Sequence, residues 1–438
     1  MLSLSSKNYN AHLADDENDQ ILPFWSASCP SDRPVPTPAL TIPTQYSPSA
    51  KALNPKINSA KIFSPIHRVP IELLGEIFDQ YLRMPYERGS PPLRSSRICG
   101  SNPIILSHVC TTWRAISISM PILWSSIYIS KPKASYLPTI RLWLERAAGC
   151  PLSLSLSQSY NAGVTEQTAT EQTLSLFITK IPQWRHIELL FSGDAKYEAL
   201  MSLSMDAARM LESAHITTTF WGQGIADHLW QKIYRLLTIR RIRWDYAYLS
   251  NGIPKHAPWT QLTHITGFQV HKAKLVDFLE ILRGCEQLVD LDLSEGVPSD
   301  QVSGQAQPVL LPNLRVLAIA TRSQDSTPLI SKLILPSLVS LETYNYCYPL
   351  PLSIACVQDL LVRSACRLEI FRFRDRHAQE HDVLDFLASP PCQSLTELEL
   401  LCPVTDRIVN FLTLSRDRMT PFLSYLERFR LPETMFDL

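Results

Sequence analysis

Residues 69–78 read Val-Pro-Ile-Glu-Leu-Leu-Gly-Glu-Ile-Phe, and this stretch decides how the front of the chain folds. Its apolar residues recur at spacings of three and four, which is the period of one helix face. They are Ile71, Leu74, Ile77, Phe78, Tyr81 and Leu82. Pro70 suits a first turn, because the N–H that proline lacks would have no helical partner there. The stretch therefore predicts an amphipathic helix that begins close to Pro70.

A second block, residues 105–124, predicts two more helices. Its helical stripe consists of Ile105, Leu106, Val109, Cys110, Trp113 and Ile116. Ser119 before Pro121 predicts a cap and a third helix through Leu123 and Trp124. The polar residues 83–103 between the blocks predict a loop. Without that loop the helices comprise roughly 45 residues, too few for a stable core without disulfides, a metal or a partner. They are either a docking module with exposed apolar surface or an ordinary corner of a larger domain.

The two blocks resemble the F-box family, whose consensus opens Leu-Pro-x-Glu-Leu-Leu-x-x-Ile-Phe and continues with Val-Cys-x-x-Trp and Leu-Trp. Val69 replaces the leading Leu, and the matching residues are Pro70, Glu72, Leu73, Leu74, Ile77, Phe78, Val109, Cys110, Trp113, Leu123 and Trp124. Residues 142–156 further resemble the large F-box families of mushroom-forming fungi, the basidiomycetes. The resemblance covers about 65 residues, and the two separated blocks agree in residue type and order.

This resemblance implies that the module binds a Skp-family adaptor protein and, through it, a cullin–RING ligase. The residues expected to bind the adaptor are Pro70, Leu74, Ile77, Phe78, Val109, Cys110 and Trp113. Some of them must instead pack in the core between the three helices, since every residue of one apolar stripe cannot both close that core and contact a partner. The implied function is a non-catalytic substrate-recognition adaptor of an SCF ubiquitin ligase, which holds a client protein for ubiquitylation. The alternative is an F-box scaffold that binds the adaptor without causing degradation.

Beyond the module, an apolar motif with spacing one-four-six recurs along the chain. The clearest copies begin at Leu288, Leu314, Leu368, Leu395 and Leu426, and partial copies begin at Trp184, Leu211, Ile239, Leu262 and Leu338. Successive starts differ by 23 to 31 residues, and helical patterns lie between them, which is typical of a leucine-rich-repeat solenoid. The alternative is a compact α/β domain with coincidental leucines.

The expected fold class is therefore an α+β or α/β solenoid. Residues 1–62, rich in Pro and Ser, are expected to be disordered because they cannot bury enough apolar surface. The resemblance and the repeats together lead us to expect a three-helix F-box over residues 63–130. Residues 131–438 are expected to form an irregular leucine-rich-repeat-like array of strands and helices that recognises the client.

Arginines occur in two groups within the predicted strands. Arg241 and Arg243 flank Ile242, and Arg372 and Arg374 flank Phe373. Since side chains alternate along a strand, these four arginines would project from the concave face, where a guanidinium can bind carboxylate or phosphate. They are the candidate client-binding residues. Acidic residues should share this face, namely Asp292, Glu342, Glu397 and Glu399. The alternative is a solvated charged face with no specific ligand.

Composition argues against several other functions. Lys plus Arg and Asp plus Glu number 41 each, so no overall field attracts nucleic acid. The sequence contains neither an 18-residue apolar run nor a secretory signal, so we expect no membrane association. The ten cysteines include no Cys-x-x-Cys pair, which predicts reduced thiols in the cytoplasm, the nucleus or both. The few glycines form no phosphate-binding loop, and no cofactor is expected.

One string matches a catalytic pattern. His377, Glu380 and His381 fit the H-x-x-E-H arrangement of inverted zinc peptidases. That chemistry needs both histidines on one face of one helix. Here Asp382 predicts a cap for a helix over 383–387, which would leave the two rings on either side of a loop-to-helix junction. We therefore expect no metal site, and a metal-dependent hydrolase using these three residues is the remote alternative.

Overall fold

The structure is a computed structural model, and it describes residues 65–82, 103–159, 161–191, 198–217, 223–244, 254, 256–267, 273–293, 307–321, 325–345, 354–403, 405–413 and 425–430. The chain divides into two units, residues 1–62 and 63–438. The segment expected to be disordered, 1–62, lies outside the described residues. So does the loop expected at 83–103, except for its last residue.

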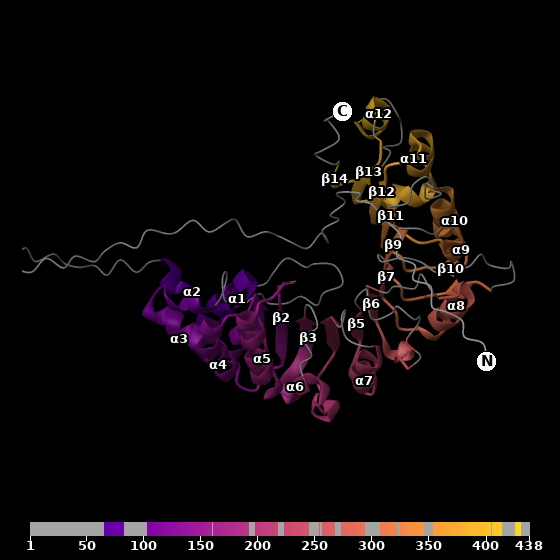
Figure 1. The fold of residues 1–438 in the computed structure, drawn as a ribbon. Helices are drawn as coiled ribbons and strands as arrows, with labels where there is room; N and C mark the ends of the chain where they lie inside the picture. Colours follow the sequence, from indigo (N-terminus) through magenta and orange to yellow (C-terminus); the bar gives the residue numbers. More distant parts are fainter. Residues whose placement is uncertain are drawn as a thin grey trace, which may run out of the picture. The chain divides into compact units, whose positions relative to one another are not determined.

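Within the described residues, twelve strands form one sheet in which every pair of neighbours is parallel (Figure 1). In order across the sheet they are β1 (Ser126–Ser130), β2 (Leu152–Ser157), β3 (Trp184–Leu190), β4 (Ser213–Thr217), β5 (Arg241–Arg243), β6 (His264–Thr266), β7 (Asp290–Leu293), β9 (Val316–Thr321), β11 (Ser340–Asn345), β12 (Ile370–Asp375), β13 (Glu397–Leu401) and β14 (Arg428–Arg430). Two short strands, β8 (Val309–Leu310) and β10 (Leu333–Ile334), pair separately.

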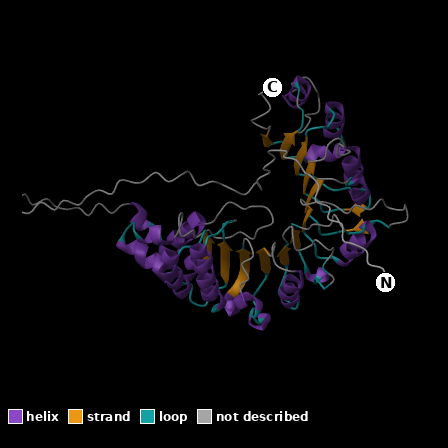
Figure 2. Ribbon diagram, in the orientation of Figure 1, coloured by secondary structure: helices purple, strands orange, loops and turns teal. Residues whose placement is uncertain are grey.

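Helices connect these strands and lie along one face of the sheet (Figure 2). They are α4 (Leu137–Arg146), α5 (Val164–Ile178), α6 (Glu198–Met201), α7 (Gln223–Tyr234), α8 (Leu275–Gly284), α9 (Thr327–Ile330), α10 (Ile354–Ser364), α11 (Glu380–Leu387) and α12 (Asp406–Thr413). Short 3-10 turns supplement them: η1 (Pro65–Arg68), η2 (Pro121–Trp124), η3 (Ala134–Tyr136), η4 (Ile181–Gln183), η5 (Met205–Ala207), η6 (Trp259–Gln261) and η7 (Pro390–Ser394). Parallel neighbours joined by helices make this an α/β fold.

The recurring apolar motif explains why the strands form where they do. All ten predicted copies coincide with a strand of the large sheet or the residues just before it. The fourth-position residues share one register row across neighbouring strands, and all are buried except Phe429 of the edge strand β14; among the buried ones are Ile242, Ile265, Leu291, Leu317, Leu341, Phe371 and Leu398. Each strand except β14 therefore buries its apolar residues against the next strand and the helix layer. The prediction of an α/β strand–helix array is confirmed, and the leucines are not coincidental.

The front of unit 63–438 contains three short helices, α1 (Ile71–Leu82), α2 (Pro103–Ser107) and α3 (Thr111–Ser119), followed by η2. The prediction of one helix along the second stripe was wrong. Cys110 is extended, with φ −158° and ψ 173°, and its Sγ accepts a hydrogen bond from the Trp113 backbone N at 3.4 Å. Cys110 thus ends one helix and caps the next.

The prediction of a capped third helix through Trp124 was also wrong. Only the single turn η2 forms there, and Met120 rather than Ser119 precedes it. The Ser119 hydroxyl donates to the Ile116 carbonyl at 2.9 Å, so it serves the end of α3 and is not a cap for the next turn. Elsewhere the described residues contain no helix long and apolar enough to cross a membrane.

Candidate functional site

Helix α1 carries two apolar rows with different surroundings. Leu74, Phe78 and Leu82, spaced four apart, are buried in the core. Leu73, Ile77 and Tyr81, also spaced four apart, are about half exposed. Residues at this spacing lie one above the other on a helix. One side of α1 therefore holds the module together, and the adjacent side presents a row of apolar side chains outward.

Exposed apolar side chains are concentrated in this module. Of seventeen large apolar residues exposed in the described part of the chain, seven lie within 71–82 and 103–119. We call these seven the outer apolar set: Ile71, Leu73, Ile77, Tyr81, Ile105, Val109 and Ile118. The other ten are spread between residues 142 and 429. Isolated exposed leucines are normal on protein surfaces, whereas such a concentration is typical of an interaction site.

The module is joined firmly to the sheet domain behind it. Trp124 is fully buried, and its indole N–H donates to the Ser117 carbonyl at 2.8 Å. Its ring also packs edge-on against Trp143 of α4, with 6.1 Å between centroids, and the Arg146 guanidinium lies 4.4 Å from its centroid. Within the module, Arg114 Nε donates to the Ser107 carbonyl at 2.9 Å and holds α3 to α2. These contacts hold α2 and α3, two of the helices that carry the outer apolar set, in fixed positions relative to one another and to α4.

The predicted adaptor-binding residues fall into three groups. Pro70, Ile77 and Val109 are exposed. Cys110 and Trp113 are half-buried, and Cys110 caps α3. Leu74 and Phe78 are buried, and their side chains pack in the core and present no surface to a partner. The prediction that these two residues bind the adaptor directly is therefore corrected.

Sequence reasoning overlooked five residues of the outer apolar set as candidates: Ile71, Leu73, Tyr81, Ile105 and Ile118. The i, i+4 row that runs through Leu73, Ile77 and Tyr81 was a signal available in the sequence, because it lies beside the core stripe at the same helical period.

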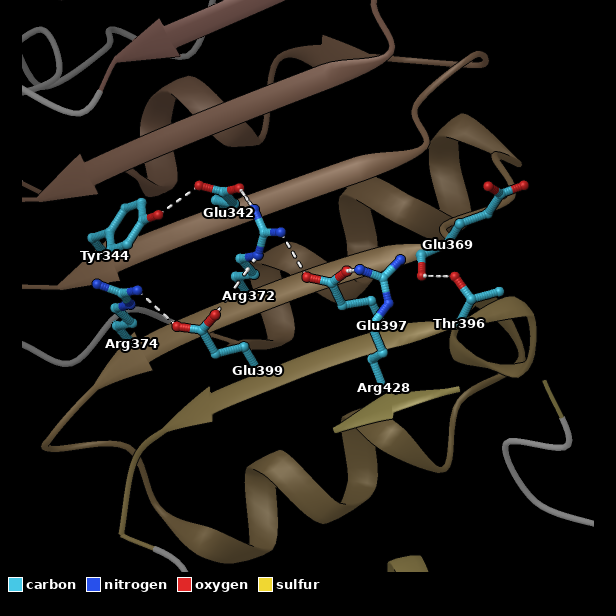
Figure 3. A network of polar contacts seen from close by, with 9 residues as sticks. All are labelled: Glu342, Tyr344, Glu369, Arg372, Arg374, Thr396, Glu397, Glu399 and Arg428. Atoms are coloured by element: carbon cyan, nitrogen blue, oxygen red, sulfur yellow. Dashed lines mark hydrogen bonds and ion pairs between the residues drawn. The ribbon is translucent and has the colours of Figure 1, made fainter. Parts of the chain in front are cut away.

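A second candidate surface is the sheet face away from the helices, where Arg372 binds three glutamates from neighbouring strands (Figure 3). Its guanidinium pairs with Glu342 of β11, with Glu397 of β13 at 2.6 Å and with Glu399 of β13 at 3.7 Å. Arg374 pairs with Glu399 at 2.7 Å. The mixed-sign surface predicted here is present, and its arginines form ion pairs with its glutamates.

The surrounding contacts complete this network. Arg428 of β14 reaches Glu397 at 3.2 Å, and the Arg374 guanidinium lies 4.9 Å from the Tyr344 ring centroid. Burial alone would lower the pKa of Arg372, but its bonds to Glu397 and Glu342 raise it above its ordinary value. Arg372 and Arg374 are therefore bound to their own chain, and a client that used them would have to displace carboxylates.

The other predicted pair, Arg241 and Arg243, lies on β5 of the same face, with both side chains half-buried. Near Arg243, Glu188 of β3 accepts a hydrogen bond from Ser155 Oγ at 2.7 Å and lies 3.1 Å from His215 Nδ1. Burial opposes ionisation of Glu188, but the bonds from His215 and Ser155 and the charge of Arg243 lower its pKa to about 2. Both hydrogen bonds converge on the carboxylate, so Ser155 is not activated as a nucleophile by His215.

The H-x-x-E-H string does not form the geometry that a zinc peptidase needs. His377 lies in the turn after β12, whereas His381 lies in α11. The helix begins at Glu380, earlier than predicted, so Asp382 is inside it and is not its cap. The Glu380 carboxylate accepts hydrogen bonds from the hydroxyl and backbone N of Thr405. No cluster of three or more His, Cys, Asp or Glu in the described ranges could hold a metal ion.

Comparisons with known proteins give little direction. No family model matches this chain, and no curated protein matches it significantly. Among solved structures, a chain of the crystal structure of the Rad7 and Elc1 complex in yeast is similar to it. The sequence identity is 13%, the match covers 77% of this chain and 84% of that chain, and the TM-score is 0.38. A TM-score of this size does not establish a shared fold.

Proposed function

We propose that this chain is an F-box protein that acts as the substrate-recognition adaptor of a cullin-based SCF ubiquitin ligase. The observation that carries the proposal is the outer apolar set, which lies on α1, α2, α3 and the turn between α2 and α3, the segments whose sequence resembles the F-box. Apolar area removed from water contributes roughly 25 cal/mol per Å². A partner that covered the exposed row of isoleucine, leucine and tyrosine would therefore gain binding free energy from the apolar area it buries.

The Skp-family adaptor would bind α1 through Leu73, Ile77 and Tyr81, next to Pro70 at the helix start. Ile105 and Val109 would extend the contact from α2 toward α3. Leu74 and Phe78 act indirectly in this proposal, because they seal α1 onto the core and thereby hold the outer row in place.

The sheet domain would hold the client. In this role the chain supplies no catalytic group; it supplies proximity. Holding a client lysine near a ubiquitin carrier makes an encounter between separate molecules effectively intramolecular. We propose that the strand–helix array is a leucine-rich-repeat-like domain whose polar sheet face binds the client, and that the ligase complex acts in the cytoplasm, the nucleus or both.

The test is co-purification of the full chain with a purified fungal Skp-family adaptor. Ile77→Asp should weaken adaptor binding by about 2–4 kcal/mol, the range of a hot-spot residue, which is about 30-fold to 1000-fold in Kd. Leu237→Asp is the matched control, since Leu237 is 82% exposed but lies outside the module. It should bind like the wild type. A folded wild-type chain that does not bind the adaptor, or equal binding by Ile77→Asp, contradicts the proposal.

A scaffold without degradative function would pass that test. A reconstituted ubiquitylation reaction separates the two functions: proteins captured with the wild-type chain should gain ubiquitin only when adaptor, cullin–RING complex and wild-type chain are all present. Captured proteins that never gain ubiquitin in the complete reaction would favour the scaffold.

A further inference from the structure

The sheet face away from the helices carries a row of polar side chains near the beginnings of five neighbouring strands. Backbone register aligns them in the order His186, Ser213, Arg241, His264 and Asp290, on β3 to β7. Adjacent strands are about 4.8 Å apart, so residues at one register position lie side by side on the face. Arg241 is therefore flanked by Ser213 and His264, with His186 one strand further away.

The Arg241 guanidinium forms no hydrogen bond or ion pair with the described residues. Its backbone N–H is bonded to the Glu212 carbonyl at 2.9 Å, while the Glu212 carboxylate pairs with Arg185 at 3.0 Å. The Arg241 side chain is also half-buried. A guanidinium that has lost part of its hydration without gaining an ion pair has its planar set of donors available to an oxyanion.

The histidines of this row, His264 next to Arg241 and His186 two strands away, leave the charge of Arg241 uncompensated, although His264 Nδ1 already lies 2.9 Å from Thr263 Oγ1. Burial, together with the charge of Arg241, lowers the pKa of His264 to about 4. Burial and the charges of Arg185 and Arg241 likewise lower the pKa of His186 to about 4, despite the opposing effect of Glu212. Both rings are therefore neutral at pH 7, and His186 Nδ1 has no hydrogen-bond partner in the described structure. A neutral imidazole can donate one N–H to an anion.

Nearby carboxylates do not neutralise this position. Asp290 is buried and lies two strands from Arg241 in the row. Glu188 lies in a different register row, beside His215 and Arg243. The ion-pair network around Arg372 contains three arginines and three glutamates. At Arg241, by contrast, the sheet face has a positive charge that the described residues leave uncompensated.

We propose that Arg241, with His264 on the next strand and His186 two strands away on the other side, binds an oxyanion of an extended client segment: the carboxylate of Asp or Glu, or the phosphate of a phosphorylated serine. This inference rests on the proposed function only in that the occupant is a client protein. The shared chemistry is a planar or tetrahedral oxyanion that accepts two guanidinium N–H bonds.

The experiment measures direct peptide binding by the purified full chain, with no adaptor present. The probes are four randomised nonapeptide pools whose central residue is Glu, Gln, phosphoserine or Ser. We expect the Glu pool or the phosphoserine pool to bind at least 10-fold more tightly than its neutral counterpart. Arg241→Gln should abolish that difference, and Arg241→Lys should retain part of it, since lysine keeps the charge but not the fork.

Arg430→Gln is the matched control. Arg430 is on the same sheet, at the β14 edge, but is exposed, so its loss should leave binding unchanged. The pool that binds identifies the oxyanion as carboxylate or phosphate. The proposal is overturned if no pool binds, if acidic and neutral pools bind equally, or if Arg430→Gln lowers binding as much as Arg241→Gln. Because this assay omits the adaptor, its failure is distinguishable from failure of the F-box proposal.

Discussion

The ring of Trp113 packs against the ring of Phe78, with 4.7 Å between their centroids and 55° between their planes. This contact joins α3 to α1. Phe78 is fully buried, whereas Ile77, the preceding residue, is 49% exposed. Phe78 therefore belongs to the row of α1 that closes the core, and Ile77 belongs to the row that α1 presents outward.

Replacing Phe78 with Ala should lower the free energy of unfolding by about 3–5 kcal/mol, because it leaves a cavity beneath Trp113 in addition to losing buried surface. Ile77→Ala should change it by about 0.5 kcal/mol or less, since an exposed side chain leaves no cavity. Urea unfolding of the full chain at pH 7 measures both. Similar losses from the two variants would mean that the division of α1 into inner and outer rows is incorrect.

Arg372→Met should be strongly destabilising. Its partners Glu342 and Glu397 have side chains only 4% and 6% exposed, and removing one partner of a buried ion pair costs about 3–5 kcal/mol. Because Arg372 itself is partly exposed, we expect the lower end of this range in urea unfolding. Adding Glu342→Gln to Arg372→Met should recover part of the loss, since one unpaired charge is then gone.

The control for this network is Arg428→Met. The Arg428 side chain is largely exposed, and exposed ion pairs contribute about 1 kcal/mol or less. If Arg428→Met destabilises the chain as much as Arg372→Met, then burial of the glutamates does not determine the energetics of this network.

Stability should fall as the pH is lowered from 6.5 toward 4. The pKa values of His186 and His264 are about 4 in the folded chain, against 6.5 for ordinary histidine. Between these values the unfolded chain binds more protons, so the free energy of unfolding rises with pH, by at most about 1.4 kcal/mol per pH unit for each histidine. Glu188 contributes little in this window, because its stabilising effect is lost only below its ordinary pKa of 4.5.

Urea unfolding between pH 5 and 6.5 tests this slope. His264→Gln removes one of the two histidines, so the variant should show a shallower dependence on pH than the wild type. If the two slopes are equal, His264 is not held neutral by the fold.

The strands were predictable from sequence because their signal is local. An apolar residue at the first and fourth positions of the motif marks each strand, and this holds from Trp184 to Leu426. The break at Cys110 was not predictable, since the helical stripe continues across it and cysteine is an uncommon cap. Its role depends on the Sγ bond to Trp113, which exists only in the folded chain.

Whether the arginines form ion pairs within the chain could not be predicted from local sequence, because it depends on long-range structure. Arg372 and Arg374 could be placed on the sheet face from period two alone. Their pairing depended on lateral register, which aligns Arg372 with Glu342 on one side and with Glu399 on the other. Nothing local in the sequence fixes that alignment between segments 25 to 30 residues apart.

Finally, the cysteines should divide by burial in their reactivity. Burial raises the pKa of Cys285, Cys392 and Cys402 to about 12 and that of Cys356 to about 11. The thiolate is the reactive species, so these four should resist iodoacetamide in the native chain at pH 8. Cys150 is only partly buried and should be alkylated within the same period. Mass spectrometry of the intact and digested chain identifies the modified residues, and alkylation in urea should reach all five. Rapid native alkylation of Cys392 would contradict this expectation, because Cys392 is fully buried in the structure, as are Phe386 and Leu395 nearby in the chain.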